Sequence, residues 1–325
     1  LIFIFFAGTT VFATPARKIS RAFSQSEKLI LNAAITRTAN YLQRTVTPQI
    51  GSVGGDWTIF GLARSKKNVD DAFFEKYFEN VENFLREQNG VLDERRFTEY
   101  SRVILALTAA GFDARDVAGF DLTIPLTDFE KTVRQGINGA IFALLALDGL
   151  GCEISQNEKI FSARKLFLEK ILREQNSDGG WALAGEKSDA DITGMALQAL
   201  AKYRDDADAN DAIERALKFL SDAQNKNGGF ASGFANASVE SSVQVLVALT
   251  ELNVSLVDPR FVKNGNTILD NVLSFQNSDG SFRHGENGAN ENLLSAEIGF
   301  YGLVAAQRSI ENKNSLYRMD DRRTR

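Results

Sequence analysis

Asp189 and Asp191 are two carboxylates that directly precede an apolar run of helical character, residues 192–203. A carboxyl group backed by a second one can act as a general acid, and two carboxylates can equally form part of a ligand site. Acidic residues at this place also stabilise the first turn of a helix. Ser188 and Asp191 have the spacing of a capping box, with Ser188 at the N-cap and Asp191 at N3. The residues alone leave the catalytic, binding and capping interpretations open.

The run that begins at Asp191 is one of six with the same spacing. Asp191 is followed six positions later by Leu197, and five other polar residues are each followed by Leu at that distance. Because each run is apolar on nearly all sides, we expect six inner helices enclosed by an outer layer. The polar residues that begin these predicted helices are Asp56, Glu99, Asn138, Asp191, Glu240 and Glu297.

A Gly-rich turn precedes the last three of these helices. Residues 175–181 read QNSDGGW, and similar turns stand at 224–230 and 276–282, a spacing of about 50 residues that is typical of repeat architectures. Each turn follows an amphipathic run, such as residues 159–175. Asn and Gly adopt the positive φ that ends a helix and reverses the chain. The repeating unit is therefore an outer helix, a turn and an inner helix, and the first three units are degenerate copies.

Six helix pairs can form an open solenoid or close into a ring. The concave face of a solenoid is wet, whereas helices that are apolar nearly all round must be enclosed on every side. The sequence therefore predicts an all-α fold, an (α/α)6 toroid over residues 29–317. We expect a linker at 14–28 before it and a short tail at 318–325 after it.

Residues 1–13 have the composition of the second half of a secretory signal peptide. An apolar stretch leads to Val11, Phe12 and Ala13, which match the small-residue pattern of a cleavage site. The stretch is too short to cross a bilayer as a helix, and no later run is long enough. We therefore expect an exported protein, extracellular or in the cell envelope, whose mature chain has no stable membrane span.

Composition argues against several kinds of chemistry. The formal net charge is −5 and the basic cluster of the chain is terminal, so nucleic-acid binding is not expected. Cys152 is the one cysteine, which excludes a disulfide within the chain. With His284 as the one histidine, the chain lacks the ligands of a Cys/His zinc site, and we expect no metal site.

The Gly-rich turns resemble the QW-type repeats of the terpenoid-cyclase and protein-prenyltransferase superfamily, whose members are (α/α)6 toroids. The resemblance runs from about Leu29 to Tyr317, and the segments that carry it are GGDWTIFGLARS, TEYSRVILALTAAGFD, QGINGAIFALLALD, DADITGMALQALAKY and KNGNTILDNVLSFQNSDGSF. It is closer still to bacterial exported proteins with prenyltransferase/squalene-oxidase-type repeats, which are related to the helical domain of transcobalamin and intrinsic factor. The resemblance is specific for the fold and much less specific for an activity.

Three activities are implied by the resemblance. Protein prenyltransferases use a zinc held by Asp, Cys and His, a pattern that is absent here. Class II terpene cyclases protonate an alkene or epoxide with the middle Asp of a DxDD motif. By resemblance Asp191 would be that acid and Asp189 its partner, but Ile192 replaces the last carboxylate. Vitamin B12 carriers hold a corrinoid between a toroid and a β-domain, so a corrinoid ligand would call for a separate β-domain or a cell-envelope partner.

Closure of the ring would bring the N-termini of the six inner helices to one mouth of the barrel. The six polar residues would then surround an opening, with Trp57, Tyr100 and Trp181 beside it. We predict a site there for a small, partly apolar ligand, isoprenoid-like or corrinoid-like, in an apolar cavity below an acidic mouth. Two alternatives stay open: a class II, squalene-type cyclase with Asp191 as general acid, and a cell-surface interaction module without a small ligand.

Overall fold

The computed structural model describes residues 22–65, 67–151, 157–231, 237–285 and 291–324. The predicted signal peptide and Cys152 lie outside these ranges. Helix α1 (Gln25–Thr45) begins inside the segment predicted as a linker, because Ser24 caps it. The Ser24 hydroxyl accepts a hydrogen bond from the Glu27 amide, and the Glu27 carboxylate accepts one from the Ser24 amide at 2.7 Å.

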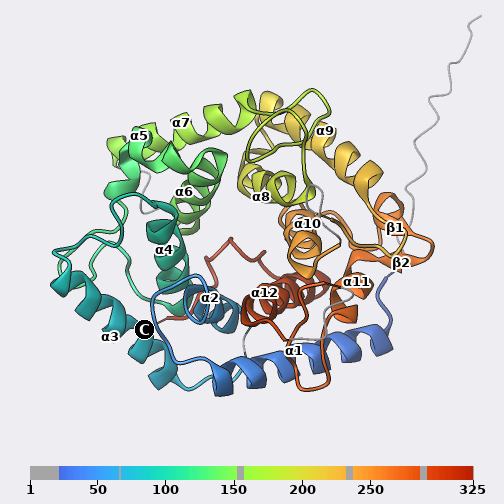
Figure 1. Ribbon diagram of the computed structural model, residues 1–325, viewed down its shortest axis with the longest axis horizontal. Coiled ribbons are helices and arrows are strands. Elements are labelled where there is room, and N and C mark those ends of the chain that lie inside the picture. The colour runs from blue at the N-terminus through green and yellow to red at the C-terminus, as the bar shows by residue number, and fades with distance from the viewer. Residues whose placement is uncertain (1–21, 66, 152–156, 232–236, 286–290, 325) are drawn as a thin grey trace, which may run out of the picture.

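Six inner helices form a closed ring in which each contacts the next and the last contacts the first (Figure 1). Their bounds are α2 (Asp56–Arg64), α4 (Thr98–Ala110), α6 (Ile137–Gly149), α8 (Ala190–Leu200), α10 (Val239–Glu251) and α12 (Leu293–Ile310). Because α12 packs against α2, the barrel has no open side. The structure confirms the predicted all-α (α/α)6 toroid and excludes the open solenoid.

The outer layer surrounds this ring and is less regular (Figure 1). Its helices are α1, α3 (Asp71–Glu87), α5 (Phe129–Thr132), α7 (Glu158–Arg173), α9 (Ala207–Ala223) and α11 (Ile268–Ser274). The connections include the 3₁₀ turns η1 (Pro125–Thr127), η2 (Val133–Gln135), η4 (Ala201–Tyr203) and η5 (Pro259–Phe261), and an antiparallel pair of strands, β1 (Val262–Lys263) and β2 (Asn266–Thr267). Four outer helices each pack on one inner helix: α1 on α12, α7 on α6, α9 on α8 and α11 on α10.

Burial explains why the two layers differ in sequence. On α3 the buried residues are Phe74, Tyr77, Val81 and Leu85, which follow one another at helical spacing, while the charged residues of the helix are exposed or only partly buried. On α6 almost every residue is buried, and the helix carries no charge before Asp148. A large apolar side chain that is fully buried contributes about 1.5–3 kcal/mol, so the doubly covered inner ring is the main source of stability.

The Gly-rich turns share one geometry. Gly179 has a φ of 91°, and the equivalent glycines of the other two turns have 84° and 95°, a left-handed conformation that other residues rarely adopt. A Cβ atom at Gly179 would also lie 2.8 Å from the carbonyl oxygen of Arg215 on α9. The Gln175 side chain donates hydrogen bonds to the carbonyl oxygens of Gly179 and Ala212, at 2.8 Å each. Each turn is thereby tied to the next outer element.

The segment after α12 crosses the C-terminal end of the barrel (Figure 1). The Tyr317 ring stacks on the Phe60 ring of α2 with 5.4 Å between centroids. Asp321 accepts hydrogen bonds from Arg64, at 2.9 Å, and from Arg308, so two buried guanidinium groups share one carboxylate. The first residues of the predicted tail are therefore packed against the barrel and close this end of it.

Candidate functional site

At the N-terminal end of the barrel, three inner helices have side chains that are partly exposed to water within their first two turns. The middle of each inner helix is buried, but α6, α8 and α10 each carry two partly exposed residues near the N-terminus. Residues four positions apart lie on one face of a helix, so the three pairs form one surface on consecutive helices. This surface, called the rim face below, consists of Asn138, Phe142, Asp191, Met195, Glu240 and Gln244.

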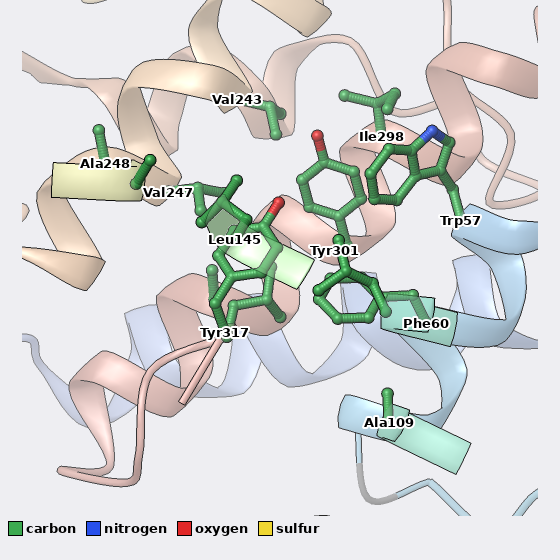
Figure 2. Packing of buried hydrophobic residues seen from close by; sticks show 14 of the residues in the cluster. Trp57, Phe60, Ala109, Leu145, Val243, Val247, Ala248, Ile298, Tyr301 and Tyr317 are labelled. Atoms are coloured by element: carbon green, nitrogen blue, oxygen red, sulfur yellow. The ribbon is translucent and has the colours of Figure 1, made fainter. Parts of the chain in front are cut away.

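Aromatic rings from the other side of the barrel lie against the rim face. The Trp57 ring of α2 has its centroid 6.0 Å from the Phe142 ring and 5.6 Å from the Tyr301 ring. Helix α4 stands between α2 and α6 in the ring, so Trp57 reaches across the barrel interior. Figure 2 shows the Tyr301 hydroxyl beside the Trp57 indole, on the side where Val243 and Ile298 lie. Val243 and Ile298 belong to the N-terminal halves of α10 and α12, so this hydroxyl faces the N-terminal end.

The N-terminal end is acidic. Glu99, at the start of α4, adds a partly exposed carboxylate and forms an ion pair with Arg102. Burial raises the pKa of Tyr301, and the carboxylates of Glu240 and Asp191 raise it further. Asp191 and Glu240 each hold the second position of their helices, and α8 and α10 are neighbours in the ring, so both carboxylates lie at the same end of the barrel.

Glu240 holds two partners outside its own helix. Its Oε2 lies 2.8 Å from Nδ1 of His284, whose side chain is 65% exposed, and its Oε1 accepts a hydrogen bond from the Ser295 hydroxyl. The serine contacts the carboxylate and not the imidazole, so these residues lack the order of a Ser-His-acid triad. His284 therefore adds a titratable contact to the rim without forming a nucleophilic site.

Asp56 lies in the barrel wall and is 0% exposed. Its Oδ1 accepts hydrogen bonds from the Tyr77 hydroxyl at 2.7 Å and the Gly51 amide at 3.2 Å, and its Oδ2 accepts one from Arg102 at 3.2 Å. Burial raises the pKa of Asp56 to about 6, although the Arg102 guanidinium and the Tyr77 hydroxyl act to lower it. Its oxygens are occupied within the protein, so Asp56 connects α2, α3 and α4 rather than facing solvent.

Glu297 is also buried in the wall. Its Oε1 accepts a hydrogen bond from the Thr58 hydroxyl at 2.6 Å and its Oε2 from the Gly54 amide at 3.1 Å, while burial raises its pKa. The prediction that the sixth inner helix begins at Glu297 is wrong by about one turn, since α12 starts at Leu293. The reason is that the Asn292 side chain caps the helix there.

Asp189 caps α8. Its side chain accepts a hydrogen bond from the Ile192 amide at 2.9 Å, so the N-cap is Asp189, and the predicted capping box with Ser188 at the N-cap is wrong. The Ser188 hydroxyl instead donates to Asp178 of the preceding turn at 2.6 Å. Burial raises the pKa of Asp189, and Asp191 lies at the second position of the helix.

Two of the three aromatic residues predicted beside the mouth lie within the wall. Trp181 is 0% exposed and its indole N–H donates to the Ile171 carbonyl oxygen at 2.7 Å. Tyr100 is 3% exposed and its hydroxyl accepts a hydrogen bond from the Leu92 amide at 3.0 Å. Of the three, Trp57 is the one that packs against the rim face.

Sequence reasoning missed Met195 and Gln244. Met195 lies four residues after Asp191 and Gln244 four residues after Glu240, and the same step leads from Asn138 to Phe142. A residue four positions further along a helix lies on the same face, so counting four positions from each predicted rim residue would have found them.

In the described part of the chain, no group of three or more His, Cys, Asp and Glu side chains is placed to hold a metal ion. None of the helices described there combines the length and the apolar character needed to cross a bilayer. The arrangement at the N-terminal end is therefore one of carboxylates, amides and aromatic rings, which can bind polar and apolar groups together and can supply a proton.

This geometry defines an α/α toroid with one polar, partly exposed end. A family model, the squalene-hopene cyclase C-terminal domain, matches residues 183–298. The drimenyl diphosphate synthase of Streptomyces showdoensis is 31% identical over 130 residues, which cover 39% of this chain and 24% of that protein. The chain spans about a quarter of the length of this curated relative.

Solved structures share the fold. An unsaturated glucuronyl hydrolase variant from Streptococcus agalactiae has a TM-score of 0.64 at 11% identity, over 88% of this chain and 93% of that one. The unsaturated glucuronyl hydrolase of Bacillus sp. GL1 has a TM-score of 0.61 at 12% identity, over 90% and 99%. At such identities the likeness shows the fold alone. Together with the family match over residues 183–298, this supports a terpenoid cyclase-like α/α toroid.

Proposed function

We propose that the protein binds a small, partly apolar ligand of isoprenoid character at the N-terminal end of its barrel. The observation that carries this proposal is the rim face, where three consecutive inner helices leave polar and apolar side chains exposed side by side, with Trp57 against them. Apolar surface with a few convergent polar groups is the usual composition of a small-molecule site. The family match over residues 183–298 includes α8 and α10 and favours an isoprenoid over a corrinoid.

The charge of the rim limits the head group of the ligand. Glu99, Asp191 and Glu240 are carboxylates. Glu99 forms ion pairs with Arg102 and Arg96, and Glu240 contacts His284. Two like charges 4 Å apart repel by about 1 kcal/mol in water and by more where water is excluded. A diphosphate would therefore be repelled. The head group that fits is neutral or cationic.

The two tryptophans allow a direct test. A Trp181→Phe chain reports on Trp57 alone, and a Trp57→Phe chain reports on Trp181 alone. Phe is a mild replacement at position 181, because Phe230 and Phe282 occupy the equivalent place in the other two turns. We expect farnesol to change the fluorescence of Trp57 saturably and to leave that of Trp181 unchanged. Farnesyl diphosphate should bind roughly tenfold more weakly than farnesol, a difference of about 1.4 kcal/mol.

Charge variants test the rim itself. Asp191→Asn and Glu240→Gln remove a repelling carboxylate, so each should tighten the binding of farnesyl diphosphate relative to farnesol. Asp208→Asn is the matched control, since Asp208 lies exposed on the outer helix α9. A response of Trp181 without one from Trp57, or equal affinity for the alcohol and the diphosphate, would contradict the proposed site.

A class II cyclase is the second candidate. It is favoured by Asp191, which is partly exposed on the rim face near the rings of Trp57 and Tyr301, and aromatic faces stabilise cations. Against it stands Ile192, which is buried where the family has its last carboxylate. Incubation with squalene or farnesyl diphosphate, followed by gas chromatography, should then give a cyclic product that Asp191→Asn abolishes. No product from the unmutated protein would sink this candidate and leave binding.

Export and the nature of the ligand complete the proposal. The apolar residues 1–13 support secretion, which fractionation of cells that express the tagged protein would measure. Mass spectrometry of small molecules that co-purify with the native protein separates three outcomes: an isoprenoid, a corrinoid that a separate β-domain partner would help to clamp, and no small ligand. The last outcome would favour a cell-surface interaction module.

A further inference from the structure

We propose that Tyr301 selects ligands that carry a hydroxyl group, by donating its phenolic hydrogen to the ligand oxygen. The inference rests on the proposed function and names the class of isoprenoid, an alcohol rather than a hydrocarbon. It is carried by a chain of hydrogen bonds that links α8, α10 and α12 below the rim face.

These hydrogen bonds fix the direction of each group. The Gln198 side-chain amide on α8 donates to the main-chain oxygen of Gln244 at 2.8 Å and to its Oε1 at 2.9 Å. With Oε1 turned toward Gln198, Nε2 of Gln244 points toward α12 and donates to the Tyr301 hydroxyl at 2.9 Å. The Tyr301 oxygen is therefore an acceptor, and its own hydrogen remains for another group.

Close packing of the helices holds this chain in place. A Cβ atom at Gly194 of α8 would lie 2.8 Å from the carbonyl carbon of Gln244, and one at Gly302 of α12 would lie 2.8 Å from Val243 of α10. The three helices approach closely because glycine stands at both crossings. The amide of Gln244 and the phenol of Tyr301 are therefore held on neighbouring helices at a fixed separation.

The phenolic hydrogen of Tyr301 lacks an acceptor among the residues that the structure describes, although the residue is 1% exposed. Buried phenols normally donate a hydrogen bond, and a buried donor without a partner is costly. The hydroxyl lies beside the Trp57 indole, on the side of Val243 and Ile298 (Figure 2). The missing acceptor is therefore supplied from the N-terminal end, where the proposed site lies.

A hydroxyl group matches this environment better than other neutral groups. Its oxygen accepts the Tyr301 hydrogen while its own hydrogen is donated to a rim carboxylate, Asp191 or Glu240. An ether oxygen accepts but does not donate, and a hydrocarbon does neither. A binding site with one phenol donor below carboxylate acceptors thus favours an alcohol.

Three probes with the same carbon chain separate these contributions: farnesol, farnesyl methyl ether and farnesene. Each is titrated into the Trp181→Phe chain while the fluorescence of Trp57 is measured. We expect farnesol to bind most tightly. Adding Tyr301→Phe should weaken the binding of farnesol and of the ether about three- to tenfold, the range expected for one neutral hydrogen bond. The affinity for farnesene should stay unchanged.

Tyr317→Phe is the matched control, because it also removes a phenolic hydroxyl from a buried ring. Tyr317 belongs to the same aromatic cluster but lies near the C-terminal end of the barrel. It should change the affinity for none of the probes. An equal loss for all three probes in Tyr301→Phe, or no loss for any, overturns the assignment while the proposed site stands. Failure of all three probes to bind the barrel with Tyr301 intact overturns both the site and the assignment.

Discussion

The two ends of the barrel differ in how they are completed. At the C-terminal end the chain itself covers the barrel, because Tyr317 stacks on Phe60 and Asp321 pairs with both Arg64 and Arg308. At the N-terminal end α2, α4, α8 and α10 each carry a carboxylate in the first turn, and the rim face stays partly exposed. One end is thus closed from within. The other presents groups that a ligand can complete.

An acid at each end shows the same contrast in the direction of its pKa shift. Burial acts to raise the pKa of Asp321, but the guanidinium groups of Arg64 and Arg308 outweigh it and hold the pKa below its usual value. At the other end, burial outweighs Arg102 and raises the pKa of Asp56 to about 6. The pKa values of these two acids therefore shift in opposite directions.

Glu251 shows that the balance between burial and charged partners, and not the end of the barrel, sets the direction of the pKa shift. It lies at the C-terminal end of α10 and accepts hydrogen bonds from the Ser315 hydroxyl at 2.6 Å and the Tyr317 amide at 3.1 Å. Burial raises its pKa in spite of these contacts. Neutral donors therefore do not offset the loss of water here, whereas the two guanidinium groups on Asp321 do.

Asp321→Ala should have the largest effect on the free energy of unfolding. It tests whether the ion pairs of Asp321 with Arg64 and Arg308 close the C-terminal end. The side chains of Arg64 and Arg308 are 1% and 2% exposed, so the change leaves two buried cations without their shared carboxylate. Breaking a buried pair in this way costs about 3–5 kcal/mol, which urea unfolding would measure. Asp320→Ala is the control, because Asp320 pairs with Arg318 at the surface, where a pair contributes about 0–1 kcal/mol. Similar losses in both variants would contradict closure.

Asp56→Asn should change how stability depends on pH and tests the buried acid of the N-terminal end. The pKa of Asp56 is raised from 3.8 to about 6, so the folded protein binds the proton more tightly than the unfolded chain. The resulting stabilisation, about 3 kcal/mol, is fully present below pH ~4 and is lost as the pH rises through about 6.

The Asn side chain keeps an oxygen that can accept from Tyr77 but does not titrate in this range. We therefore expect the unmutated protein to lose stability relative to Asp56→Asn between about pH 4 and 6. Urea unfolding at a series of pH values measures the difference. Two profiles that run parallel over this range would show that Asp56 does not carry a raised pKa in the folded protein.

The repeat pattern was enough to predict the ring, because each apolar run must be buried on all sides and each turn needs its glycine. Five predicted inner helices begin within two residues of the observed start, but the sixth does not, since Asn292 offers an earlier cap. Gln88, Asn89 and Gly90 follow α3 but do not form another copy of the turn, since Asn89 has a φ of 50° and the Gly90 amide donates back to the Leu85 carbonyl oxygen at 2.8 Å.

Which polar residues face the barrel interior could not be predicted from the repeat. Asp56 and Asp191 follow the same six-position rule, yet Asp56 is enclosed because Tyr77 and Arg102, from other helices, reach its oxygens. Closure of the C-terminal end was missed for the same reason. Arg64 is the last residue of α2, and its partner Asp321 lies 257 positions later in the sequence. Such pairings follow from the closed ring and not from local pattern.

Replacing Asp189 should have the smallest effect and separates helix capping from ligand binding. Asp189→Ala loses the hydrogen bond from the Ile192 amide and should cost about 1 kcal/mol in urea unfolding, while Asp189→Asn keeps an acceptor and should cost little. Asp189→Asn should also leave the preference between farnesol and farnesyl diphosphate unchanged, whereas Asp191→Asn should shift it. If Asp189→Asn shifts the preference as strongly as Asp191→Asn, the two carboxylates act as a pair, as the cyclase candidate requires. In that case the rim has a catalytic arrangement that capping does not explain.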